Sequence, residues 1–261
     1  MQNKPFIYRF PIQYLGLRYA GWAKQNNAKT VQGTLERCIR YVLGHEQFRT
    51  LGASRTDAGV SANQAFFCLY VASEIENIGS FHEAINRNLP PDIRVGEGRV
   101  VDASFNIIQD VASKEYHYHV AYGEKFHPFH AGTLSFFPED LAVEEMKEAI
   151  KIFIGKHDFR RFCSADKVSD SYEREILHAE VLHHPLAGID DFPKKSLLIK
   201  LRGAGFLRYQ IRIMVQALVD LGAGKVSKEG LKDALKSLEK SPITQAAPAN
   251  GLVLFKVEFK T

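Results

Sequence analysis

A carboxylate and a guanidinium lie two residues apart in a short polar segment, Gly52 to Val60, with the sequence GASRTDAGV. Arg55 and Asp57 are flanked by small residues, which let the backbone turn tightly and let a large substrate approach. A nearby cation favours the ionised form of an aspartate, and an ionised, oriented aspartate can act as a nucleophile or a base. Asp57 is therefore a candidate catalytic group. The alternative is an Asx-turn, in which its side chain only ties its own loop.

Hydrophobic patterns predict the elements that position this segment. It follows a strand that ends at Leu51 and precedes a strand from Phe66 to Val71. Upstream, a strand over residues 6–15 runs into a glycine-punctuated loop, and Thr30 is expected to cap a helix that ends at Gly44. The other expected strands are 93–101, 116–122, 176–183, 197–202 and 252–259, and the other expected helices are 80–86, 142–154, 207–221 and 228–238.

The two halves of the chain repeat the same mixture of strands and helices. Each half begins with a strand and crosses through a helix, which predicts an α+β fold of two RRM-like or ferredoxin-like halves. Their strands are expected to form a continuous, mainly antiparallel sheet flanked by helices. We place the N-terminal α+β half at residues 1–105, with Asp57, and the C-terminal α+β half at residues 106–261.

Composition limits the classes of protein that this chain can belong to. Its 261 residues can bury a substantial core, and 45% hydrophobic and 25% charged residues are typical of soluble globular proteins. The first ten residues contain no long apolar stretch, so we expect a cytoplasmic protein. Cys38, Cys68 and Cys163 are too widely separated to indicate a disulfide framework or a zinc site. A net charge of +4 is compatible with a polyanionic partner but does not require one.

The segment Arg55 to Val60, RTDAGV, resembles the core motif of the tRNA pseudouridine synthase A (TruA) family. Seven further segments of the chain accompany it. All of them are similar to segments of that family and occur in its order, so the resemblance covers nearly the whole chain. They are YLGLRYAGW (14–22), TVQG (30–33), LPPDIRV (89–95), SKEYHYHV (113–120), GKHDF (155–159), GFLRYQIR (205–212) and APANGL (247–252).

The resemblance implies an isomerase that converts uridine to pseudouridine at positions 38, 39 and 40 of tRNA, in the anticodon stem and loop. It implies that Asp57 is the essential catalytic aspartate and that Arg212 is the basic residue paired with it. Arg55 would help to displace the target nucleotide, Tyr116 would stack on the uracil, and Leu252 would border the active site. A homodimer that binds tRNA is also implied, with the active-site cleft between the halves of each subunit.

The reaction explains why it needs these residue types. It breaks the C1′–N1 bond, turns the free uracil and rejoins it through C5, after the nucleotide has left its stack. A charged aspartate in a partly dry pocket needs a cationic partner, which Arg212 would supply. An aromatic face at Tyr116 and an apolar wall at Leu252 would retain the uracil. The isomerisation is redox-neutral and uses no group donor, so we expect no cofactor and no metal. A covalent adduct of Asp57 and abstraction of a ribose proton both stay open.

Other hypotheses meet specific objections. A glycosidase also cleaves at an anomeric carbon, but it normally needs a second carboxylate opposite the first, and none is evident near Asp57. A non-catalytic RNA-binding protein would need RNP-type aromatic motifs, which the strands do not convincingly carry. The segment 222–225 lacks the residues that complete a P-loop.

Some positions differ from the family pattern. Ser61 occupies the place of a common histidine, Ser54 that of a frequent glycine, and Ile213 that of a frequent asparagine. Ala23 and Lys24 also differ from the glutamine and arginine that commonly follow GW. None of these changes removes the expected catalytic set, but a synthase of the same family that acts on another RNA site stays an alternative.

Overall fold

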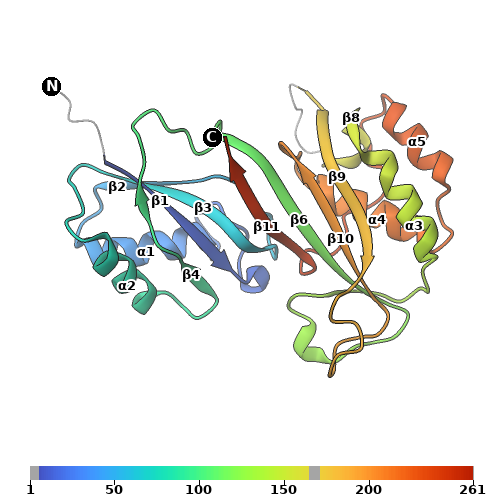
Figure 1. Cartoon of the computed structure of the whole chain (residues 1–261), viewed down its shortest axis with the longest axis horizontal. Helices are drawn as coiled ribbons and strands as arrows, with labels where there is room; N and C mark the ends of the chain where they lie inside the picture. Colours follow the sequence, from blue (N-terminus) through green and yellow to red (C-terminus); the bar gives the residue numbers. More distant parts are fainter. Residues whose placement is uncertain (1–5, 165–170, 261) are drawn as a thin grey trace. The chain divides into compact units, whose positions relative to one another are not determined.

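The structure is a computed structural model that describes residues 6–164 and 171–260. In these residues it has an α+β fold with eleven strands and five α-helices (Figure 1). The strands are β1 (Phe6–Tyr14), β2 (Phe48–Gly52), β3 (Ser61–Val71), β4 (Ile93–Val95), β5 (Arg99–Val100), β6 (Val111–Tyr122), β7 (Ser135–Phe137), β8 (Gly155–Asp158), β9 (Glu173–His183), β10 (Ser196–Gly203) and β11 (Leu252–Phe259). The helices are α1 (Val31–Leu43), α2 (Ile78–Asn88), α3 (Val143–Ala149), α4 (Gln210–Gly222) and α5 (Lys228–Lys236).

The strands belong to one large, mixed, mainly antiparallel sheet. Its hydrogen-bonded order is β4-β1-β3-β11-β6-β10-β9-β8, while β2 pairs with β3, β5 with β1, and β7 with β6. The β6–β7 pair is parallel, whereas β1–β3, β6–β10, β9–β10 and β8–β9 are antiparallel. The predicted α+β class and the mainly antiparallel sheet are therefore confirmed.

The chain divides into two compact units. Within the described residues, unit 1 comprises 6–112 and 254–260, and unit 2 comprises 113–164 and 171–253.

None of the helices in these residues combines the length and the apolar character that a membrane span requires. The same residues contain no cluster of three His, Cys, Asp or Glu side chains arranged to hold a metal ion.

In unit 1, helices α1 and α2 pack against each other and cover one face of the strands (Figure 1). The predicted ends of α1 are confirmed: the Thr30 side chain accepts a hydrogen bond from the Gly33 amide, and Gly44 follows the helix with φ 73°. A positive φ at the end of a helix favours glycine because it has no Cβ. The buried side of α1 carries Val31 and Leu35, which are completely enclosed.

In unit 2, α4 is the central helix. All its residues are buried except Arg212 and Asp220. It packs against α3, and α3 also contacts β9. A helix that is apolar nearly all round is stable only when neighbouring elements enclose it. Arg212 is therefore the cation that interrupts an otherwise buried helix, as its sequence context indicated.

Among the predicted elements whose extents differ in the structure, two are interrupted and one starts later than expected. The strand expected over 93–101 is split into β4 and β5, and the intervening Gly98 lies against the Phe10 ring, where a Cβ would come within 2.1 Å of a ring carbon. The helix expected over 142–154 is α3 followed by a 3₁₀ turn, Ile150–Phe153. Helix α4 begins at Gln210 and not at Leu207, because Tyr209 has a left-handed backbone with φ 62°.

Truncation of the buried face of α1 tests this packing. We expect Leu35→Ala to lower the free energy of unfolding by about 2–5 kcal/mol, because Leu35 is 0% exposed and its removal leaves a cavity. Tyr41→Ala on the same helix is the control, since Tyr41 is 75% exposed and its loss should change stability by less than about 0.5 kcal/mol. Urea unfolding of both variants measures the difference. Equal losses would contradict this account of the core.

Candidate active site

The loop that carries Asp57 connects β2 to β3 in unit 1, as its sequence predicted. Arg55 is exposed, Thr56 is buried and Asp57 is half-buried. The carboxylate is thus neither enclosed in the core nor fully surrounded by solvent. This degree of burial is what a charged group needs if it is to stay ionised and still meet a substrate.

The segment 14–22 holds this loop from the side through the backbone. The Trp22 amide donates to the Thr56 carbonyl at 3.1 Å, and the Gly59 amide donates to the Tyr19 carbonyl at 3.1 Å. The Tyr14 hydroxyl lies 2.8 Å from Thr56 Oγ1. Burial raises the pKa of the Tyr14 hydroxyl while its bond with Thr56 opposes that rise, so the phenol stays protonated. Thr56, immediately before Asp57, and Gly59, two residues after it, are therefore held by contacts outside the loop.

Glycines in the same segment make this close approach possible. A Cβ on Gly16 would lie 2.1 Å from the Val60 carbonyl oxygen, and one on Gly21 would lie 2.6 Å from the Thr56 carbonyl oxygen. Gly21 also has φ +96°, a backbone conformation that residues with a side chain rarely adopt. The two glycines of YLGLRYAGW thus explain why that motif accompanies the RTDAGV loop in one chain.

The loop itself closes with a tight turn. The Val60 amide donates to the Asp57 carbonyl at 3.2 Å, and Gly59 has φ +79°. A positive φ at the third residue of such a turn favours glycine. The hydrogen bond that closes the turn is thus accepted by the backbone carbonyl of Asp57.

Two of the departures from the family pattern lie beside this loop. Ser61 Oγ accepts a buried hydrogen bond from the Gly16 amide at 2.9 Å, so it joins β3 to the start of the loop-holding segment. Ser54 Oγ is buried and has no hydrogen-bond partner among the described residues. Ile213 is buried in α4. Ser61 thus has a clear local structural role, and nothing in the structure explains Ser54.

Arg212, in unit 2, has its guanidinium oriented by two contacts. Its Nε donates to the Ala247 carbonyl at 2.7 Å, and its guanidinium carbon lies 5.0 Å from the centre of the Tyr209 ring. The guanidinium of Arg208 lies 4.8 Å from the same ring centre. Cations are attracted to aromatic faces at these distances. Because Nε makes the bond to Ala247, both terminal nitrogens of Arg212 keep their capacity to donate.

Tyr116 lies on β6 of unit 2, opposite Leu201 of β10. Its ring is 9% exposed and meets the edge of the Phe206 ring, with the centroids 5.3 Å apart and the planes at 84°. Edge-to-face packing fixes the plane of an aromatic ring. The ring that is predicted to stack on uracil is therefore held by the GFLRYQIR segment.

Leu252 is 4% exposed and follows a segment that hydrogen bonds hold in place. The Asn250 amide nitrogen donates to the carbonyls of Ala131 and Leu134, both at 2.9 Å, and its oxygen accepts from Ser135 Oγ at 3.0 Å. A Cβ on Gly251 would lie 2.6 Å from the His119 carbonyl oxygen, so only glycine fits there.

The Tyr118 hydroxyl anchors the same segment through a bond of 2.7 Å to the Pro248 carbonyl. Burial raises the pKa of this hydroxyl, while its bond with Ser135 and the charge of Arg212 oppose that rise. The phenol is thus neutral and donates to Pro248.

Sequence reasoning missed the residues that position the predicted ones. Tyr14, Tyr209 and Asn250 contribute contacts that orient the loop, Arg212 and the strand of Leu252. Their presence inside the matching motifs was the available signal. A motif does not separate a residue that touches substrate from one that positions another, so their roles become clear only from distances.

Comparison with known proteins identifies the class. A family model described as tRNA pseudouridine synthase matches residues 149–260. The match points to an isomerase of the tRNA pseudouridine synthase class.

The curated relatives narrow the assignment from this enzyme class to one family. The tRNA pseudouridine synthase A of Pseudothermotoga lettingae is 33% identical over 95% of this chain and 97% of its own length. Those of Clostridium kluyveri and Anoxybacillus flavithermus are each 34% identical, over 94% and 95% of this chain and 96% of their own lengths. The chain therefore belongs to the tRNA pseudouridine synthase A family. The family and the enzyme class predicted from the motifs are confirmed, and the roles of single residues stay predictions.

The contact at Gly16 provides a test of how the catalytic loop is held. We expect Gly16→Ala to lower the free energy of unfolding by about 2 kcal/mol or more, because its Cβ would meet backbone atoms of Val60 that cannot move alone. Gly205→Ala is the control, since nothing lies within 4 Å of a Cβ placed there. Thermal and urea unfolding of both variants give the comparison. A Gly16 variant as stable as the Gly205 variant would show that the loop does not depend on this approach.

Proposed function

We propose that this isomerase forms pseudouridine at positions 38, 39 and 40 of tRNA, in the anticodon stem and loop, with Asp57 as the essential nucleophile or base. The observation that carries the proposal is a half-buried aspartate on a loop that is fixed on both sides of it. Family membership supports the activity. The tRNA positions rest on the resemblance of the motifs.

The exposed Arg55 suits a role before the chemistry. A uridine must leave its stack before its C1′ can be reached, and protein contacts must offset that cost. Arg55 lies two residues before Asp57 on the same fixed loop, with its side chain open to solvent. We assign to it the displacement of the target nucleotide, because a guanidinium can fill a vacated stack and bind phosphate oxygens.

The remaining roles are assigned to residues of unit 2. Arg212 would keep the Asp57 carboxylate ionised, Tyr116 would stack on the uracil and Leu252 would bound the pocket. The structural support is that each of these side chains is oriented by neighbours within its own unit. This assignment includes the proposal that two RRM-like or ferredoxin-like halves contribute to one active-site cleft, which rests on the family resemblance and on the needs of the reaction.

We further propose that the enzyme acts on tRNA as a cytoplasmic homodimer. The names of the relatives support a tRNA substrate. The dimer rests on the resemblance alone, and sedimentation of the purified protein tests it directly.

Replacement of the carboxylate tests the assignment of Asp57. We expect Asp57→Asn to lower the rate of pseudouridine formation by at least about 100-fold, because the amide is neither a nucleophile nor a base. Asp233→Asn is the matched control, since it removes the same charge from an exposed position on α5. Chemical mapping of pseudouridine in a tRNA transcript after incubation measures the product and its position. Activity of Asp57→Asn equal to that of the control would refute the assignment, and product at other positions would revise the substrate site.

A separate variant tests Arg55. We expect Arg55→Ala to lower the single-turnover rate constant by about tenfold or more and to weaken tRNA binding by less than about threefold, because one exposed phosphate contact contributes little affinity. Arg55→Lys keeps the charge but not the planar guanidinium, so it should recover affinity more fully than rate. Quenched single-turnover assays measure the rate constant, and binding titrations measure the affinity for tRNA. Parallel losses of rate and affinity would reduce Arg55 to a phosphate contact.

A further inference from the structure

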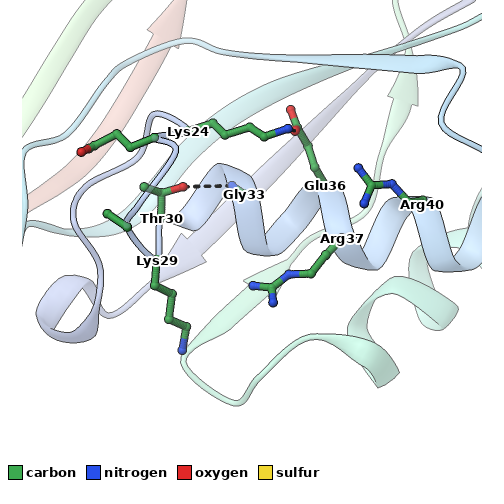
Figure 2. Close-up of a pocket in the computed structure, with 9 residues that line it drawn as sticks. Lys24, Lys29, Thr30, Gly33, Glu36, Arg37 and Arg40 are labelled. Atoms are coloured by element: carbon green, nitrogen blue, oxygen red, sulfur yellow. Dashed lines mark hydrogen bonds and ion pairs between the residues drawn. The ribbon is translucent and has the colours of Figure 1, made fainter.

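A positively charged groove of about 240 Å³ lies at the start of α1 in unit 1 (Figure 2). Its walls carry four cations, Lys24, Lys29, Arg37 and Arg40, against one carboxylate, Glu36. None of these residues belongs to the catalytic set proposed above. The groove is too small for most organic ligands, which occupy roughly 300–1,000 Å³, but it has room for a phosphate and part of its sugar.

Two of the four cations are already neutralised. Lys24 reaches across the groove to Glu36, with Nζ 3.1 Å from Oε2 (Figure 2). Arg40 pairs with Glu46 at 2.8 Å. Lys29 and Arg37 are exposed and form no ion pair within the part of the chain that the structure describes. The unbalanced charge of the groove is thus concentrated on these two side chains.

Lys29 and Arg37 extend from the same side of the groove. The Lys29 ammonium lies 4.9 Å from the centre of the Tyr19 ring. Burial raises the pKa of the Tyr19 hydroxyl, its bond to Asp92 adds to the rise, and the charges of Arg18 and Arg37 oppose it. Figure 2 shows both cations extending to the same side of α1, away from Glu36. Two exposed cations on one side of a helix, neither of them in an ion pair within the described residues, are suited to an anion.

The kind of anion follows from the backbone. The first amides of α1 are already used: Val31 donates to the Gly21 carbonyl, Gln32 to the Trp22 carbonyl and Gly33 to Thr30 Oγ1. A small free phosphate is normally held by several such amides at a helix start. A groove that offers only long, solvated cations instead suits the phosphodiesters of a polymer, which bind largely by releasing counterions.

Tyr19 also connects the groove to the catalytic loop. Its ring supports Lys29, and its carbonyl accepts from the Gly59 amide, two residues after Asp57. We propose that Lys29 and Arg37 bind a backbone phosphate of the RNA whose uridine is presented to Asp57. The proposal rests on the proposed function, because the RNA that occupies the groove is the substrate of that loop.

Neutral substitution of the two cations tests the groove. We expect Lys29→Gln/Arg37→Gln to raise the Kd for an unmodified tRNA transcript about tenfold at roughly 150 mM salt and to reduce the slope of log Kd against log salt by about 1–2. At saturating tRNA the single-turnover rate constant should change less than about twofold, because neither side chain touches the reacting atoms.

Two control variants accompany this test. Lys228→Gln/Lys236→Gln removes the same charge from exposed positions on α5 and should leave Kd and slope within about twofold of the unsubstituted protein. Lys29→Arg/Arg37→Lys retains both charges and should restore the affinity. All variants are expected to fold, because the substituted side chains are exposed. Thermal unfolding of each variant checks this.

The outcomes separate this proposal from its rivals. A salt slope equal to that of the α5 control, or no tRNA binding by the unsubstituted protein, would overturn it. A calorimetric titration with inorganic phosphate adds a second arm: binding that is lost in Lys29→Gln/Arg37→Gln while the tRNA slope is unchanged would make the groove a site for free phosphate. Absence of pseudouridine with a reduced slope would instead refute the proposed function and leave the groove as an RNA contact.

Discussion

The backbone contact between the segment 14–22 and the Asp57 loop is the constraint on which the site depends. An aspartate that must stay charged and meet a large substrate cannot be buried, and side chains at the surface are normally mobile. Here the residue before Asp57 is bonded to Trp22 through the backbone and to Tyr14 through its hydroxyl, and Gly59 after it is bonded to Tyr19. The loop is therefore held in place, while the side chain that we propose as catalytic stays accessible.

The same principle holds Arg212 within unit 2. The guanidinium extends from a helix that is otherwise buried, so the backbone of Arg212 is well fixed. The Ala247 carbonyl and the Tyr209 ring then set the direction of the side chain. Tyr209 adopts a left-handed conformation, which non-glycine residues rarely take without compensating contacts. Its ring contacts two guanidiniums, and these contacts are the compensation that the structure provides.

Local patterns in the sequence predicted the elements that local physics determines. Helix α1 was predicted from Thr30 to Gly44 because capping depends on residues a few positions apart. The break between β4 and β5 and the late start of α4 were not predicted, since they depend on the Phe10 ring and on the backbone of Tyr209. The candidate catalytic residues were named through their motifs. Their supports, such as Asn250, needed distances, because a hydrogen bond between residues more than a hundred positions apart leaves no local pattern.

Electrostatics connects the Asp57 loop with the groove. A carboxylate that approaches a polyanion is exposed to negative potential, which favours its protonated form and opposes association. Since the whole chain carries only a small net charge of +4, the average surface potential offsets little of this effect. A local concentration of cations is needed where the RNA backbone passes. Arg55 lies on the loop itself, and Lys29 lies against the ring of Tyr19, whose backbone carbonyl accepts a hydrogen bond from Gly59 of the loop.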